Sequence, residues 1–125
     1  MNGAPHRIRI KRIYESPEDD DGKRLLVDRL WPRGISKERA ALDGWPKEVA
    51  PSPDLRKWFN HEPERFPEFS ASYQAELDAG QASYEFAAQC RTWLEQGNVT
   101  LLYAAKDPVI NHASVLRDWL ERKIG

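Results

Sequence analysis

Residues 24–34, RLLVDRLWPRG, join a short apolar run to a charged end. Leu25, Leu26 and Val27 show no polar alternation, which is typical of a central strand that is covered on both faces. The residues after them stand at the carboxyl end of this predicted strand, where α/β proteins build their sites. A second run, TLLYAAK at residues 100–106, has the same form. The sequence therefore predicts two buried strands that deliver charged side chains to one place.

The rest of the chain alternates strand and helix signals around these two runs. In residues 7–14, RIRIKRIY, isoleucines alternate with basic residues, which predicts a first strand with one covered face. Helices are predicted to begin at Ser36, at Ser52 with Pro53, near Pro63 and Pro67, at Gln81 and near Asn111. We expect an α/β fold in which residues 1–125 form a single compact domain, with a small, mostly parallel sheet flanked by helices.

The spacing of apolar residues and the position of glycines add detail to this prediction. Phe69, Tyr73 and Leu77 recur at steps of four and form one buried helix stripe. Gly97 stands where a left-handed helix cap is expected. Residues 15–23, ESPEDDDGK, contain a run of acids with proline and glycine, which predicts a flexible, solvated acidic loop.

The composition restricts the class of protein. With 125 residues, of which 40% are hydrophobic, the chain can bury a core but is too short for two ordinary domains. The formal net charge of −1 gives no overall attraction to nucleic acid or anionic lipid, so a basic site must be local. No apolar run is long enough to cross a bilayer, and the first residues lack the apolar core of a signal peptide. We therefore expect a cytoplasmic protein without membrane contact.

The first two charged residues after the strand at residues 25–27 allow two interpretations. Asp28 and Arg29 are adjacent, so on a strand they point to opposite faces, and only one can aim at a cleft unless the chain has begun to turn. In one interpretation, Asp28 and an arginine form an ion pair that closes the sheet edge. In the other, they contact a ligand.

The next residues form a stiff loop. Pro32 biases Trp31 toward an extended conformation, and this rigidity suits a loop that presents Arg33 for recognition. Gly34 permits a positive backbone angle or the close approach of a ligand, although a single glycine is more often a simple turn.

The second charged strand end leads into the last predicted helix. Lys106 and Asp107 end the strand, and Asn111 and His112 lie at the helix start, where free amides and the dipole attract a phosphate or carboxylate. Asn111 is also a good helix cap without any ligand. The positive end of the dipole favours the neutral imidazole of His112, which can then act as a base or a hydrogen-bond partner.

Other kinds of chemistry find little support. His61 is a minor site candidate, because loop histidines usually have no specific role. The three histidines show no close pairing at metal-ligand spacing, and no phosphate-binding glycine loop is present, so we expect neither a metal nor a cofactor. Cys90 lies in the middle of a predicted helix on its apolar face, which favours a small core residue over a nucleophile.

Several motifs together resemble the YeaO-like proteins, small bacterial members of the domain-of-unknown-function family 488 (DUF488). They are KRIYE (residues 11–15), GKRLLVDRLWPRGISK (22–37), APSPDLRKWFNH (50–61), YQAEL (73–77), TLLYAAKD (100–107) and NHASVL (111–116). The resemblance extends from about Lys11 to Leu120 and implies a compact α/β domain, but it implies no activity. It also implies that LVDRLWPRG and the segment from AKD to NHA are family hallmarks, which favours one shared site built from both.

The first functional hypothesis is a protein that binds a small anionic ligand, such as a phosphate-bearing metabolite or nucleotide, at the strand ends. Arg33, Lys106 and the amides of the last helix would hold the anion, and Trp31 would stack on a ring. If the protein is an enzyme, Asp28 or His112 is the best acid or base, and hydrolysis or group transfer is the expected reaction. The remaining ligand-binding candidates are Arg29, Asp107 and Asn111.

Two alternatives involve no catalysis. A nucleic-acid or protein binding module would use Trp31 as a stacking platform beside the cations Arg29, Arg33, Lys37 and Arg39, although the net charge weighs against nucleic acid. A structural interpretation treats the charged residues as a buried ion-pair network, with Trp45 and Trp58 in a dimer surface. The sequence is compatible with a monomer or a homodimer.

Overall fold

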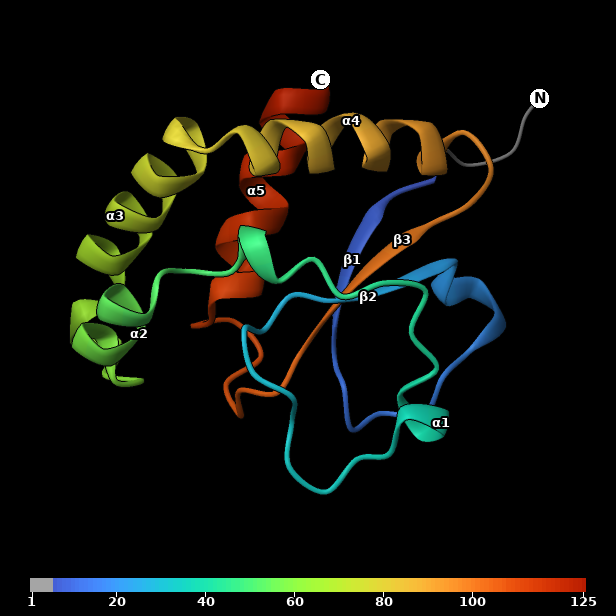
Figure 1. The fold of residues 1–125 in the computed structure, drawn as a ribbon, viewed down its shortest axis with the longest axis horizontal. Helices are drawn as coiled ribbons and strands as arrows, with labels where there is room; N and C mark the ends of the chain where they lie inside the picture. Colours follow the sequence, from blue (N-terminus) through green and yellow to red (C-terminus); the bar gives the residue numbers. More distant parts are fainter. Residues whose placement is uncertain (1–5) are drawn as a thin grey trace.

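The computed structural model describes residues 6–125 and contains a three-stranded, all-parallel sheet. The strands are β1 (Ile8–Arg12), β2 (Lys23–Leu26) and β3 (Val99–Tyr103), and β3 lies between the other two (Figure 1). Every residue of β3 is buried, as its uninterrupted apolar sequence requires for a central strand. The structure confirms an α/β fold with a small parallel sheet.

Within residues 6–125, five helices lie around the sheet. They are α1 (Lys37–Ala40), α2 (Pro53–Phe59), α3 (Phe66–Ala79), α4 (Gln81–Leu94) and α5 (His112–Ile124). The side chains of Ser36, Ser52 and Asn111 each accept a hydrogen bond from a backbone N–H three residues later, so the predicted starts of α1, α2 and α5 are confirmed. Short 3₁₀ turns occupy Asp19–Asp21, Lys47–Val49 and Pro63–Arg65. Among residues 6–125, no helix has both the length and the apolar character that a membrane span requires.

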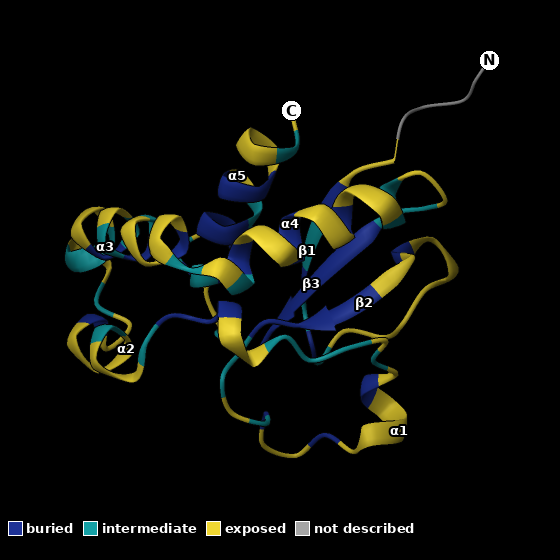
Figure 2. Ribbon diagram, turned by 45° about the horizontal axis from the view of Figure 1, so that its top comes forward, coloured by how far each residue is buried: buried dark blue, intermediate teal, exposed yellow. Residues whose placement is uncertain are grey.

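The two faces of the sheet contact different parts of the chain. On one face, Leu25 and Leu101 are paired neighbours that pack against α3, α4 and α5 in the main core. On the other face, Leu102 packs with Ile13, Ile35 and Ala40, which brings α1 beneath the sheet. Figure 2 shows α4 and α5 on one side of the sheet and α1 on the other.

A buried charged cluster also lies on the face that carries Leu102. Asp21, in the acidic segment 15–23, is fully buried and forms ion pairs with Lys11 of β1 and Arg24 of β2. The hydroxyl of Thr100 donates a hydrogen bond to the backbone carbonyl of Asp21. The segment is thus attached to the sheet through Asp21, a feature that its acidic composition did not indicate, and its flexibility stays a prediction.

The predicted left-handed cap at Gly97 is wrong. Helix α4 ends in a right-handed turn at Glu95, and the amide of Gly97 donates back to the carbonyl of Trp93 without a positive φ. A left-handed residue is not required, because the chain passes from this turn directly into β3. The positive φ that Gly34 permits is present, at 74°.

Candidate functional site

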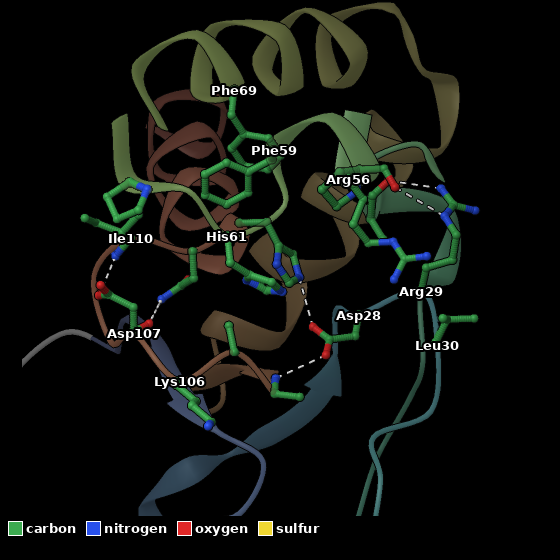
Figure 3. Close-up of a pocket in the computed structure, with 17 residues that line it drawn as sticks. Asp28, Arg29, Leu30, Arg56, Phe59, His61, Phe69, Lys106, Asp107 and Ile110 are labelled. Carbon is green, nitrogen blue, oxygen red and sulfur yellow. Dashed lines mark hydrogen bonds and ion pairs between the residues drawn. The ribbon is translucent and has the colours of Figure 1, made fainter. Parts of the chain in front are cut away.

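A cavity of about 620 Å³ opens at the carboxyl ends of β2 and β3 (Figure 3). One wall is formed by residues 28–30 and 104–107, which follow these strands, and the others come from α2, the first turn of α3 and the start of α5. Ligands of open parallel sheets bind in the crevice outside the strand ends. The fold therefore brings the two charged strand ends to one cavity.

Asp28 joins three parts of this wall. Its Oδ2 atom accepts a hydrogen bond of 3.1 Å from the amide of Ala104, just after β3. Its Oδ1 atom is buried and lies 3.0 Å from the Nε2 atom of His112, at the start of α5. Its backbone carbonyl accepts a hydrogen bond of 2.7 Å from the indole N–H of Trp45. The carboxylate thus connects the ends of two strands and a helix.

The ring of His112 faces two acceptors with one nitrogen. Its Nε2 atom lies 3.0 Å from the carbonyl oxygen of Val27 and 3.0 Å from the Oδ1 atom of Asp28. Because neither oxygen can donate, Nε2 carries a proton, which it donates to Val27. The proton is therefore held by a backbone carbonyl beside the carboxylate.

Arg29 lines the same cavity as Asp28 because the chain bends directly after Asp28. Its guanidinium donates hydrogen bonds to the backbone carbonyls of Ala50 and Pro51, at 3.1 and 3.2 Å. These bonds fix the segment that forms the adjacent wall, so part of the donor capacity of Arg29 is already used.

Two further cations line the cavity without a protein partner. The side chains of Arg56, from α2, and Lys106, after β3, are exposed and form no hydrogen bond or ion pair with residues 6–125. Figure 3 shows Arg56 near Arg29 on one side of the cavity and Lys106 on the other, with Asp28 and His61 between them. Their charges are free to meet an anion.

The remaining polar residues of the second strand end hold the turn into α5. The Oδ1 atom of Asp107 accepts hydrogen bonds from the amides of Val109 and Ile110, which lower the pKa of Asp107. The side chain of Asn111 caps α5 through the amide of Ser114 and donates to the carbonyl of Asp107. Asp107 and Asn111 line the cavity, but the Oδ1 atom of each is engaged with backbone N–H groups.

Two of the predicted site residues do not line the cavity. The indole N–H of Trp31 donates to the carbonyl of Ile35 at 2.8 Å, and its ring meets that of Trp45 edge-on, with centroids 5.3 Å apart. The side chain of Arg33 is exposed, and its carbonyl accepts a hydrogen bond from Tyr14. Residues 31–34 therefore pack beneath the sheet with α1, because the chain leaves the strand end at Arg29.

The cavity also has an aromatic side that the sequence did not reveal. Phe59 of α2 stacks on Phe69 of α3, with centroids 4.3 Å apart, and both rings line the cavity. His61, the minor candidate, lines it as well, and its backbone has a φ of 56°. The motif APSPDLRKWFNH, which contains Arg56 and Phe59, was the signal that could have pointed to this side.

Two other features fall outside the cavity. Cys90 is completely buried in α4, and burial raises the pKa of its thiol to about 12, so it stays protonated and unreactive. Glu18, Asp20 and Asp21 bring carboxylate oxygens within 4.8 Å of one another. Because Asp21 already binds Lys11 and Arg24, this cluster is balanced by cations of the protein itself.

Comparison with known proteins agrees with the motifs. The family model described as the inactive DUF488-N3 subclade matches residues 7–125. The uncharacterized protein YeaO of Escherichia coli K12 is 46% identical over 113 residues, which cover 90% of this chain and 96% of that protein. The uncharacterized protein Rv3073c of Mycobacterium tuberculosis H37Rv is 43% identical over 114 residues, covering 91% and 93% of the two chains. No solved structure matches the chain significantly.

Proposed function

This chain belongs to the DUF488 family, and we propose that it binds a small anionic ligand in the cavity at its strand ends without reacting with it. The observation that carries this proposal is the balance of charge around the cavity. Among residues 6–125, the side chains of Arg56 and Lys106 have no partner, and together with Arg29 they bring three positive charges to the cavity. Asp28 and Asp107 bring two negative charges, so the formal charge of these lining side chains is positive.

Binding is favoured over catalysis by the contacts of the two best acid–base candidates. Asp28 is held by the amide of Ala104, and the proton of His112 is held by the carbonyl of Val27. A general acid or base needs a proton position that is within reach of the substrate, whereas the Nε2 proton of His112 and the Oδ2 atom of Asp28 are each engaged with a backbone group. The word inactive in the description of the matching family model supports the same choice.

A ligand screen by thermal shift tests this function. The purified protein is heated with inorganic phosphate, nucleotides, sugar phosphates or short oligonucleotides, and the screen is repeated on Arg56→Ala and Arg33→Ala. Both arginines are exposed, but only Arg56 lines the cavity, so Arg33→Ala is a matched control. We expect a stabilising compound whose effect is lost in Arg56→Ala and kept in Arg33→Ala. The proposal would be contradicted if no compound stabilised the protein, or if the stabilising effect were lost in Arg33→Ala alone.

The same screen separates the nucleic-acid alternative. That alternative needs Trp31 as a stacking surface, but the ring of Trp31 is packed against Trp45 and the apolar cluster around Ile35. An oligonucleotide effect that weakens with salt and depends on Arg33 rather than Arg56 would favour it. Size-exclusion chromatography of the same samples tests the expectation of a monomer or homodimer.

A further inference from the structure

We propose that the ligand is an aromatic molecule with a single anionic group, with its ring against the side of the cavity that contains Phe59 and the anionic group at Arg56. This inference rests on the proposed function and specifies the ligand class. It follows from the size of the cavity, from its apolar surroundings and from the arrangement of the charged side chains around it.

The cavity is larger than an anion requires. A phosphate or carboxylate group alone would fill only a small part of about 620 Å³ and would leave water against Phe59, Phe69 and Ile110. Cavities of roughly 300–1,000 Å³ with mainly apolar walls typically hold a whole small molecule, which a few polar groups orient. The ligand therefore has an apolar body in addition to its charge.

An exposed apolar side chain also lines the cavity. Leu30 is 58% exposed and follows Arg29 in the wall after β2. An apolar part of a ligand that covers Leu30 would remove this surface from water, which favours binding.

The aromatic lining favours a flat body over an aliphatic one. Phe59 and Phe69 are stacked at an interplanar angle of 19°, and the ring of His61 lies 6.2 Å from that of Phe59. A flat ring of the ligand can pack against these three rings in an offset or edge-on arrangement. Such contacts stabilise binding beyond the burial of apolar surface alone.

The charges around the cavity fit one anionic group. Arg29 already donates to two backbone carbonyls, so Arg56 is the guanidinium with a free donor pair. A paired donor of this kind matches a carboxylate or a phosphate in two parallel hydrogen bonds. Lys106 lies on the opposite side of the cavity, and Asp28 between them opposes a second anion near the centre (Figure 3).

Calorimetric titration of the full chain tests the ligand class with defined probes. Phenyl phosphate and benzoate carry a ring and an anion, methyl phosphate and acetate carry the anion alone, and benzyl alcohol carries the ring alone. We expect each aryl anion to bind roughly tenfold or more tightly than its alkyl counterpart, because the ring leaves water. The two aryl probes distinguish a phosphate from a carboxylate ligand.

Two exposed-residue variants show which part of the probe each side of the cavity holds. Arg56→Gln is expected to weaken phenyl phosphate and methyl phosphate by the same factor, whereas His61→Ala removes a ring 6.2 Å from that of Phe59 and is expected to weaken phenyl phosphate alone. Both side chains are exposed, so neither change removes core packing. Arg33→Ala should bind all probes as the unchanged protein does.

The outcomes separate the two proposals. If methyl phosphate binds as tightly as phenyl phosphate and needs Arg56, the cavity binds anions and the aromatic class is wrong. If benzyl alcohol binds as tightly as the aryl anions, the anionic function itself is wrong. If no probe binds at 20 mM, a concentration on the order of that at which small fragments bind, both proposals are overturned.

Discussion

The Nε2 atom of His112, at the start of α5, lies 3.0 Å from the Oδ1 atom of Asp28, just after β2. The same nitrogen donates its proton to the carbonyl of Val27, and the other oxygen of Asp28 accepts from the amide of Ala104. These contacts join α5 to the ends of both strands. The pair therefore fixes the wall on which the cavity is built, whether or not a ligand is bound.

Replacing Asp28 by asparagine should weaken the fold. The asparagine oxygen can still accept from Ala104, but its NH₂ group would then face the protonated Nε2 atom of His112, so two donors would oppose each other. We expect a loss of about 1–3 kcal/mol in the free energy of unfolding, which is typical of a buried polar group without a partner. Urea denaturation measures this loss, with the exposed Asp118→Asn as control. Equal stability of the two variants would show that the contact between Asp28 and His112 does not stabilise the fold.

Asp21 offers a second test of a buried charge. Its carboxylate lies between Lys11 and Arg24, both nearly buried, so Asp21→Asn would leave Arg24 without its anion and Lys11 with Glu18 alone. Breaking such a pair from one side costs about 3–5 kcal/mol. The neighbouring Asp20 pairs with Arg9 at the surface, with 71% of its side chain exposed. Asp20→Asn should therefore cost under about 1 kcal/mol in the same denaturation experiment. Similar losses for both variants would refute the role assigned to Asp21.

The pH dependence of stability should report the same cluster. Burial alone raises the pKa of Asp21, but hydrogen bonds from the Glu18 amide, Lys11 and Arg24 outweigh it and hold the pKa below 3.8. A lowered folded-state pKa gives stability that is present above the unfolded value and is lost as the pH falls through the folded value. Denaturation midpoints should thus fall with pH below 3.8. Asp78 and Asp107 also have lowered pKa values, so Asp21→Asn should reduce this slope without abolishing it. If the pH dependence of stability were the same in Asp21→Asn, Asp21 would not contribute to it.

Two glycines provide a matched pair for backbone strain. Gly22 has a φ of 64°, and a Cβ atom at this position would lie 1.9 Å from the carbonyl oxygen of Asn98. Gly97 has no positive φ, and no atom lies within 4 Å of the place where its Cβ would be. Gly22→Ala should cost more than about 2 kcal/mol, because backbone must move to admit the methyl group. Gly97→Ala should be neutral or slightly stabilising. Thermal unfolding of the two variants measures both effects, and equal melting temperatures would contradict the close approach.

The elements that were predicted correctly depend on short-range chemistry. Ser36, Ser52 and Asn111 cap helices through hydrogen bonds to residues three positions away, so the sequence alone contains both partners. The apolar runs of β2 and β3 likewise carry their own signal. The end of α4 was predicted incorrectly. The conformation of Gly97 depends on how the chain continues into β3, and the local sequence does not determine this path.

The candidate site shows the same division. Asp28 and Lys106 meet at one cavity because parallel strands place their carboxyl ends on one edge, which follows from the predicted topology. Arg56 was missed because α2 reaches the cavity through the stacking of Phe59 on Phe69, a contact between two helices. Arg33 lies outside the cavity, and the sequence did not indicate this because the bend after Asp28 is not visible in a strand pattern.

Arg29 and Arg56 should differ in how their loss affects the cavity. Arg29 holds the backbone of Ala50 and Pro51 through a guanidinium with two separate donors, and a lysine can replace only one of these bonds. Arg29→Lys should therefore lower the free energy of unfolding by about 0.5–1.5 kcal/mol. It should also weaken phenyl phosphate, because the adjacent wall is no longer fixed.

Arg56→Gln should weaken the same probe and leave stability within about 0.5 kcal/mol of the original, since the side chain of Arg56 is exposed and has no partner among residues 6–125. Urea denaturation and calorimetric titration on both variants separate the two effects. If Arg29→Lys loses binding but keeps full stability, Arg29 contacts the anion directly, and its role in positioning the wall is wrong.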